Sequence, residues 1–171
     1  MNAQIKDGVL AIIEIPSYKY NVSDYLLVRD KTIRPGFDRI KSGFPGGGVE
    51  YGESHMDAIL RELWEEGGIE SYHLVKDLKL TTFHYKVRMA DICNKNFIFT
   101  GTLKSSIDIQ SLKTNDEKEV TKIHSKSIVE MLGMYKYDLI HEGTMRIILL
   151  NELGIREGKL HEPVLYKDVY Y

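Results

Sequence analysis

Arg61, Glu62, Glu65 and Glu66 place four charges within one short stretch of a 171-residue sequence. Residues three and four positions apart lie on the same side of an α-helix, so the three glutamates are expected within reach of one shared point. Negative charges held so close repel each other, and a divalent cation among them removes that cost. Carboxylate oxygens are hard ligands that suit Mg²⁺ or Mn²⁺. The stretch therefore predicts a metal site, with a solvated helix face carrying internal ion pairs as the alternative.

A glycine run precedes this stretch and has two interpretations. The residues from Gly43 to Gly48 let the backbone approach a ligand closely and turn a carbonyl toward the cation, or they form a plain tight turn. No Gly-Lys-Ser or Gly-Lys-Thr follows, so the run is not a P-loop. Arg61 is expected to pair with Glu65 or Glu53, which fixes the geometry without occupying the metal position.

The carboxylates require a helix, and the sequence marks both of its ends. Ser54 is a good N-cap, Asp57 can reach back to it, and Gly67-Gly68 supplies a left-handed stop. The predicted helix covers residues 55–66. At about 100° per residue, apolar residues gather on one side and charges on another. The apolar side is expected to hold Met56, Ile59, Leu60 and Leu63, and the charged side Ala58, Glu62, Glu65 and Glu66.

Apolar and β-rich runs on both sides of this helix predict strands, with turn-rich loops between them. A mixed α/β fold in one domain over residues 1–171 is the natural interpretation. The aromatic tail from residue 159 has no assignment. The expected strands are 8–15, 25–28, two or three within 72–87 and 95–103 joined by 88–95, and 119–125; the expected further helices are 127–132 and 143–154.

The composition is that of an ordinary globular protein, with 28% charged and 43% hydrophobic residues. A formal net charge of -2 gives no overall basic field, so binding to long nucleic acid is not favoured. Cys93 is the single cysteine, which excludes an internal disulfide and a cysteine metal cluster. A cytoplasmic setting without a membrane partner is expected, because no leader pattern and no apolar run of roughly 20 residues is present.

The segment as a whole resembles the signature of the Nudix hydrolase family at every fixed position. The resemblance covers 23 residues, from Gly47 to Ile69, and GFPGG before it is similar to the family's usual lead-in. The matching pattern is Gly47, five residues, Glu53, seven residues and then Arg61-Glu62-Leu63-Trp64-Glu65-Glu66-Gly67-Gly68-Ile69.

The resemblance implies a Nudix-like α/β/α sandwich around a mixed β-sheet. It also implies a pyrophosphohydrolase that uses Mg²⁺ or Mn²⁺ to cleave a phosphoanhydride in a nucleoside diphosphate derivative, such as a nucleoside triphosphate, a nucleotide sugar or a dinucleoside polyphosphate. Carried over residue by residue, it implies metal binding by Glu62, Glu65, Glu66 and the carbonyl of Gly46, an orienting Arg61 paired with Glu53, and a supporting role for Gly47.

The residue that takes the proton from water varies within this family, so two positions stay open. One is Glu62. The other is a later acidic turn that holds Asp116, Glu117 and Glu119, of which Glu117 is the first candidate. A charged surface turn is the alternative for this segment.

Tyr85 stands sixteen residues after Ile69. The resemblance implies a tyrosine at this place in diadenosine polyphosphate hydrolases, where its ring could stack on a nucleobase. The alternative is an ordinary tyrosine in a strand.

The rival function from another class is a non-catalytic Nudix-like domain that binds a nucleotide and regulates a partner. Such domains commonly lose signature glutamates, and this sequence keeps them, which favours catalysis. The oligomeric state stays open, with a homodimer as one alternative.

Overall fold

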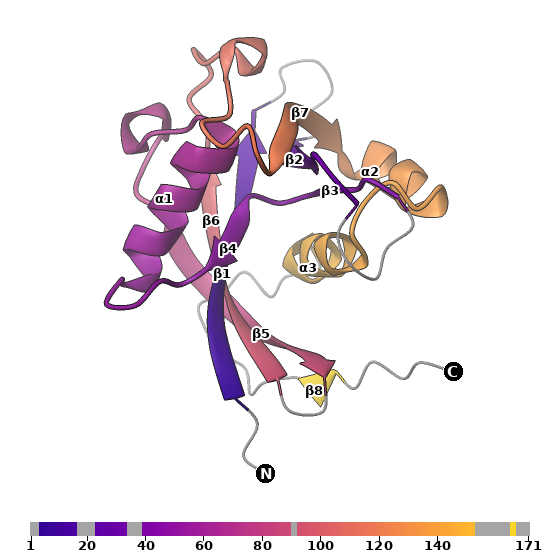
Figure 1. Ribbon diagram of the computed structural model, residues 1–171. Coiled ribbons are helices and arrows are strands. Elements are labelled where there is room, and N and C mark those ends of the chain that lie inside the picture. Colours follow the sequence, from indigo (N-terminus) through magenta and orange to yellow (C-terminus); the bar gives the residue numbers. More distant parts are fainter. Residues whose placement is uncertain (1–3, 17–22, 34–38, 90–91, 153–164, 167–171) are drawn as a thin grey trace.

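The computed structural model describes residues 4–16, 23–33, 39–89, 92–152 and 165–166. Within these ranges the chain forms one eight-stranded mixed sheet flanked by helices (Figure 1). The strands are β1 Gln4–Ile15, β2 Asp24–Asp30, β3 Ser42–Gly43, β4 Gly46–Gly48, β5 Lys79–Met89, β6 Ile92–Thr102, β7 Val120–Ser127 and β8 Leu165–Tyr166. The α-helices are α1 His55–Gly67, α2 Ile128–Lys136 and α3 Glu142–Glu152, and two 3-10 turns, η1 Ser71–His73 and η2 Ile109–Ser111, lie in the connections.

Strand β1 is the centre of the sheet. It runs parallel to β6 along its whole length and antiparallel to β2 and β4. The strand order is β3-β2-β1-β6-β5-β8, with β7 added on β2. Because side chains alternate along a strand, Val9, Ala11 and Ile13 enter one core while Ile12 enters the other. A strand buried on both faces explains its continuous apolar sequence.

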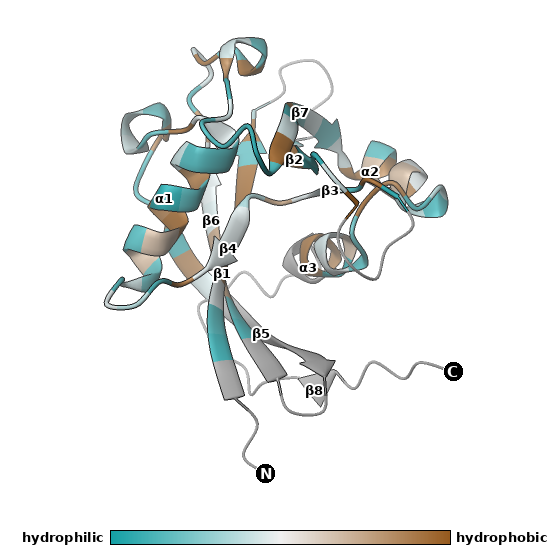
Figure 2. Ribbon diagram, in the orientation of Figure 1, coloured by the Kyte–Doolittle hydropathy of each residue, from teal (hydrophilic) through white to brown (hydrophobic). Residues whose placement is uncertain are grey.

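The two cores define the three layers. Helix α1 covers one face through Ala58, Ile59 and Leu63. Helices α2 and α3 cover the other face, where Met131 and Ile148 are buried. Figure 2 shows hydrophobic residues concentrated in the strands and on the helix sides that meet them. The predicted α/β/α sandwich around a mixed sheet is confirmed.

Helix α1 has the predicted ends. The Ser54 hydroxyl accepts a bond from the Asp57 backbone N–H at 3.1 Å, and Gly68 closes the helix with φ 61°. The predicted apolar side is confirmed for Ile59 and Leu63, which are buried, but not for Met56, and the predicted charged side is not solvent-facing as a whole. Ala58, Glu62 and Glu66 form one buried row along the helix, while Met56 is 37% exposed. The sequence shows which residues share a side, but the docking angle on the sheet decides which side is covered.

Several predicted bounds also change in the structure. The glycine run includes strand β4, which pairs with β1 through Gly46, Gly47 and Gly48. Most of the expected connection 88–95 is strand, because β5 extends to Met89 and β6 begins at Ile92. Helix α2 continues to Lys136, beyond the expected end at residue 132. Among the described helices, none has the length and apolar character needed to cross a membrane.

Candidate functional site

Arg61 is the hub of the carboxylate cluster on α1. Its Nε and Nη2 donate to the two carboxylate oxygens of Glu53, at 2.9 and 3.1 Å. Its Nη1 donates to Glu62 Oε1 at 2.7 Å and to Glu65 Oε2 at 3.0 Å. Nη2 also donates to the carbonyl of Gly48 at 2.9 Å. One guanidinium therefore ties the helix to the loop before it and to β4, as the sequence predicted for Glu53 and Glu65.

Glu62 is a buried carboxylate pressed against β4. It is 8% exposed, and a Cβ built on Gly47 would lie 2.3 Å from Glu62 Oε1. Only glycine at position 47 leaves room for the carboxylate in this place. Burial raises the pKa of Glu62 above its ordinary value, and the charges of Glu65 and Glu119 add to this effect, while Arg61 opposes it.

Glu66 is buried more deeply, at 4% exposed, and it also meets β4. Its Oε2 accepts a hydrogen bond from the backbone N–H of Gly46 at 2.8 Å. The sequence comparison with the Nudix signature assigned the carbonyl of Gly46 to the metal site, whereas the contact recorded here uses its amide. Strand β4 thus holds Glu62 by close packing and Glu66 by a hydrogen bond.

The carboxylates of Glu62, Glu65 and Glu66 lie near each other on α1, but they do not converge on one position. Among the residues that the structure describes, no three acidic, histidine or cysteine side chains converge closely enough to hold a metal ion together. The physical reason is Arg61, whose Nη1 lies between Glu62 and Glu65, while Glu66 turns to Gly46. The expectation of a single shared point is therefore not met in this arrangement.

The donor set nevertheless fits a divalent cation in its chemistry. Glu62, Glu65 and Glu66 offer hard anionic oxygens, the ligand type of Mg²⁺ and Mn²⁺. A cationic group, the guanidinium of Arg61, already lies between two of them. Burial raises the pKa of Glu62 although Arg61 lowers it, and a cation bound nearby would favour the charged carboxylate further.

The acidic turn 113–119 is seated on the C-terminal end of α1. The backbone N–H groups of Asn115 and Asp116 donate to the carbonyl of Glu65 at 2.7 and 2.9 Å, and the Thr114 hydroxyl donates to the same carbonyl at 2.9 Å. Gly68 allows this approach, because a Cβ there would lie 2.2 Å from the carbonyl oxygen of Lys113. A segment far along the chain is therefore fixed beside the carboxylates.

Within this turn the structure separates the candidate proton acceptors. Glu119 is close enough for its charge to raise the pKa of Glu62. Asp116 is engaged in the turn, since its Oδ1 accepts from the backbone of Lys118 and Glu119. The side chain of Glu117 is exposed, and it lines a groove beside β7.

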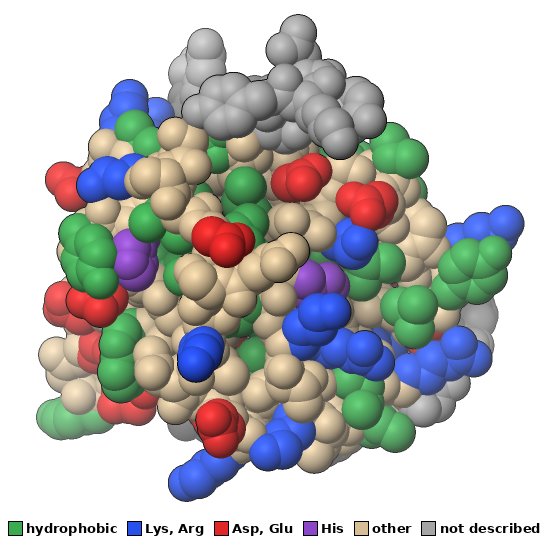
Figure 3. Space-filling view, turned by 90° about the horizontal axis from the view of Figure 1, so that it is seen from above, with side chains coloured by type: hydrophobic (Ala, Val, Ile, Leu, Met, Phe, Trp, Pro, Cys, Tyr) green, Lys and Arg blue, Asp and Glu red, His purple; other side chains and the backbone are tan. Residues whose placement is uncertain are grey.

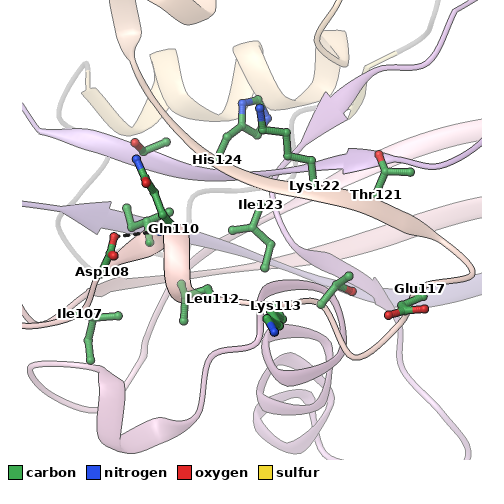
Figure 4. Close-up of a pocket in the computed structure, with 13 residues that line it drawn as sticks. Ile107, Asp108, Gln110, Leu112, Lys113, Glu117, Thr121, Lys122, Ile123 and His124 are labelled. Carbon is green, nitrogen blue, oxygen red and sulfur yellow. Dashed lines mark hydrogen bonds between the residues drawn. The ribbon is translucent and has the colours of Figure 1, made fainter.

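That groove, called the β7 groove below, is an open hollow of about 850 Å³ between residues 107–114 and β7 (Figure 4). Ile107, Leu112 and Ile123 supply apolar lining. Charge of both signs is present, from Lys113 and Lys122 and from Asp108 and Glu117. Glu62, Glu65 and Glu66 are not among the residues that line this groove, which shares Thr114 and Glu117 with the acidic turn.

Two further residues complete the comparison with the sequence. Tyr85 lies in β5, where its backbone pairs with Lys95, but its side chain lies outside the described part of the structure. His55 Nε2 lies 2.8 Å from Asp7 Oδ2 and its ring packs on Phe97, with centroids 3.7 Å apart. This link fastens the first turn of α1 to β1. Nothing in the spacing of Asp7 and His55 marked them as partners.

Comparison with known proteins identifies the family. A model of the NUDIX domain matches residues 7–139. Among solved structures, a NUDIX hydrolase from Nitrosomonas europaea is 25% identical, with 98% of both chains covered and a TM-score of 0.65. The NUDIX domain of Shewanella oneidensis NrtR, solved in complex with ADP ribose, is 17% identical, with 90% of this chain and 89% of that chain covered and a TM-score of 0.66.

Curated relatives match only a short part of the chain. The RNA pyrophosphohydrolase of Psychrobacter cryohalolentis is 55% identical over 31 residues, which is 18% of each chain. The RNA pyrophosphohydrolase of Bartonella bacilliformis is 47% identical over 36 residues, or 21% of each chain. The chain thus aligns with about a fifth of the length of these relatives.

Proposed function

The chain belongs to the NUDIX domain family, and on that premise we propose that it is a metal-dependent pyrophosphohydrolase acting on a nucleoside diphosphate derivative. The bond broken is a phosphoanhydride. The substrate class includes nucleoside triphosphates, nucleotide sugars and dinucleoside polyphosphates. The likeness to a NUDIX hydrolase structure over nearly the whole chain supports a hydrolase that acts on pyrophosphate bonds.

One observation carries this proposal: two buried carboxylates, Glu62 and Glu66, lie against a glycine strand beside an arginine hub. Burying carboxylates costs free energy unless a partner compensates them. A protein that only needed a stable α1 would place apolar residues in this row. Arg61 and the backbone N–H of Gly46 offset part of this cost, and a cation bound by these oxygens would give the row its purpose.

In the proposed enzyme Glu62, Glu65 and Glu66 hold Mg²⁺ or Mn²⁺, with Gly46 beside them. When bound, the cation offsets the charge of the phosphoanhydride and lowers the pKa of a water molecule. Arg61 holds the carboxylates in place through Glu53 and Gly48, and the glycine at position 47 keeps Glu62 in contact with β4.

The proton from water needs an acceptor, and we place it either at Glu62 or in the acidic turn. The raised pKa of Glu62 makes its carboxylate a stronger base than an exposed glutamate. Glu117 is the first candidate of the turn by its place in the sequence, while the electrostatic contact of Glu119 with Glu62 supports Glu119. Single Glu→Gln variants at the three positions separate them, because only loss of the base removes the acidic limb of the pH–rate profile.

Substrate choice and setting complete the proposal. Tyr85 is proposed as a stacking partner for the nucleobase. The NrtR domain bound to ADP ribose and the relatives named RNA pyrophosphohydrolase add a nucleotide sugar and the 5′ end of RNA as substrates to test.

We place the protein in the cytoplasm, with a homodimer as one alternative for its assembly.

A substrate panel tests the function directly. Purified protein is incubated with each nucleotide class, with and without Mg²⁺ or Mn²⁺, and released phosphate and nucleoside monophosphate are measured. We expect hydrolysis of at least one class, lost when the metal is removed and lost in Glu66→Gln. Tight binding of a nucleotide without any hydrolysis would support the regulatory binding domain instead.

A further inference from the structure

Thr114 joins two segments that are far apart in the chain. Its hydroxyl donates to the carbonyl of Glu65 at 2.9 Å and accepts from the backbone N–H of Asp116 at 3.0 Å. The backbone N–H groups of Asn115 and Asp116 donate to the same carbonyl. Asn115 Nδ2 donates to the carbonyl of Trp64 at 2.8 Å. The Thr114 side chain is therefore bonded to α1 on one side and to the acidic turn on the other.

The carbonyl of Glu65 lies at the end of α1, where a helix has no internal donors left. The backbone N–H of Gly68 donates to the carbonyl of Trp64 at 3.2 Å. The backbone N–H of Ile69 donates to the carbonyl of Leu63 at 3.0 Å. These two bonds close the helix, and the carbonyl of Glu65 is the next that needs a donor. The acidic turn supplies it.

Charge alone would not keep the acidic turn in this place. Asp116, Glu117 and Glu119 outnumber the two lysines of segment 113–119. The C-terminal end of a helix carries partial negative charge, which disfavours further carboxylates beside it. Seen from above, acidic side chains already gather toward α1, and basic side chains gather toward β7 and α2 (Figure 3). Hydrogen bonds therefore hold the turn on α1 against the repulsion of like charges.

The same set of bonds fixes the backbone of Glu119. Its N–H donates to the carbonyl of Asp116 and to Asp116 Oδ1, both at 3.3 Å. Its carbonyl accepts from the backbone N–H of Lys31 at 2.7 Å. Burial is the main cause of the raised pKa of Glu62, and the charge of Glu119 adds to it, so Glu119 lies near the carboxylate cluster. Glu117, by contrast, lines the β7 groove.

We propose that Thr114 is a positioning residue for the hydrolysis, whose hydroxyl holds the acidic turn on α1 and so keeps the carboxylate of Glu119 beside the carboxylate cluster. This inference rests on the proposed function. Thr114 acts through the backbone of Asp116 and Glu119 and not through contact with substrate. Its loss should lower kcat and leave KM unchanged, because a catalytic group misplaced by about 1 Å can cost roughly 10²-fold in rate.

The test removes the hydroxyl and keeps the shape of the side chain. Thr114→Val deletes both hydrogen bonds, and Thr114→Ser keeps the hydroxyl. Ser111→Ala is the matched control, because the Ser111 hydroxyl donates to the carbonyl of Asp108 at 2.6 Å, a contact within η2 and its cap. We expect Thr114→Val to lower kcat about 10- to 100-fold at constant KM, and the other two variants to stay within about threefold of the parent. Equal rates of Thr114→Val and Thr114→Ser, or an equal loss in Ser111→Ala, would overturn the proposal.

A double-mutant cycle separates positioning from a general loss of structure. Thr114→Val is made in the parent and in Glu119→Gln. If Thr114 acts through Glu119, its loss should cost little more once the Glu119 charge is gone, because coupled positions are not additive. Losses in kcat that multiply would overturn the proposal. Asn115→Ala, which removes the bond to the Trp64 carbonyl, takes the place of Thr114→Val in the cycle if that variant does not fold.

Hydrogen exchange gives a second measurement that does not depend on substrate. Exchange is followed by mass spectrometry on peptides that cover the acidic turn and α1. We expect faster exchange in the turn of Thr114→Val than in the parent or in Thr114→Ser, because the bonds that protect its backbone are lost. Exchange in Thr114→Val that equals the parent overturns the inference. A parent protein that shows the expected exchange but hydrolyses no substrate of the panel would refute the proposed function, and with it the catalytic part of this inference.

Discussion

Arg61 and Glu53 form a two-point ion pair, with Nε 2.9 Å from Oε1 and Nη2 3.1 Å from Oε2. A planar guanidinium matches the two oxygens of a carboxylate, and a lysine ammonium does not. The pair lowers the pKa of Glu53, whose charge is thereby fixed on the loop before α1. Both side chains are less than one-quarter exposed, so solvent weakens the pair less than it would at the surface.

Arg61→Lys should keep the positive charge but lose the two-point hydrogen bonding to Glu53. We expect activity to fall about 10- to 100-fold, as for other residues that orient metal ligands, while the circular dichroism spectrum stays normal. Steady-state kinetics on the best substrate of the panel provide the measurement. Full activity in Arg61→Lys would show that the fork of hydrogen bonds is dispensable.

Gly47→Ala should displace Glu62, because the added Cβ would lie 2.3 Å from its Oε1. We expect a loss of activity of about 10²-fold or more with modest loss of stability. Gly48→Ala is the matched control, since a Cβ at Gly48 meets nothing within 4 Å. Equal activities of the two variants would contradict the role assigned to the contact between Gly47 and Glu62.

Glu62→Gln should make the protein more stable and less active. The pKa of Glu62 is raised in the folded state, so between pH 4.5 and that higher pKa the folded state binds more protons than the unfolded state. Stability is therefore full below pH 4.5 and declines as pH rises through the folded pKa. Glutamine keeps the shape and an acceptor for Arg61 but carries no charge.

The measurement is thermal unfolding of both proteins across this pH range without divalent metal. We expect the melting temperature of Glu62→Gln to exceed that of the parent at pH 7, and the two to converge at low pH. A lower melting temperature of the variant at pH 7 would show that the Glu62 charge is well compensated without a metal.

His124 should make the folded protein less stable as pH falls, the opposite of the effect of Glu62. Its pKa of about 4 in the folded state lies below the ordinary histidine value of 6.5, so the unfolded state binds more protons between these values. Stability is present above pH 6.5 and is lost as pH falls toward 4. We expect this loss to shrink by roughly 1–2 kcal/mol in His124→Gln, a figure reduced for solvent screening. Urea unfolding at a series of pH values measures it, and identical pH profiles would contradict it.

The sequence located α1 closely because its signals are local. Ser54 caps the first turn and Gly68 takes the left-handed conformation that ends the helix, and both depend only on neighbouring residues. The Arg61–Glu53 pair was predicted for the same kind of reason, since loop and helix are adjacent in the chain. The layered fold followed from the family resemblance and the coarse order of the elements.

The remaining features depend on contacts between distant segments. Glu62 and Glu66 are buried where they contact β4, whose position follows from its pairing with β1. The contact between the acidic turn and Glu65 joins residues about fifty positions apart in the chain. No local sequence pattern predicts either contact. The spacing of the residues also could not predict that Arg61 Nη1 lies between Glu62 and Glu65, where the sequence suggested a metal ion.

The most direct test of the account is metal binding by the carboxylates of α1, measured by isothermal titration calorimetry with Mn²⁺ and accompanied by turnover on the best substrate. We expect the parent protein to bind Mn²⁺, and Glu66→Gln to lose both this binding and at least about 10²-fold in turnover while it unfolds at a normal temperature. A Glu66→Gln protein that binds Mn²⁺ and turns over substrate like the parent would contradict the central claim.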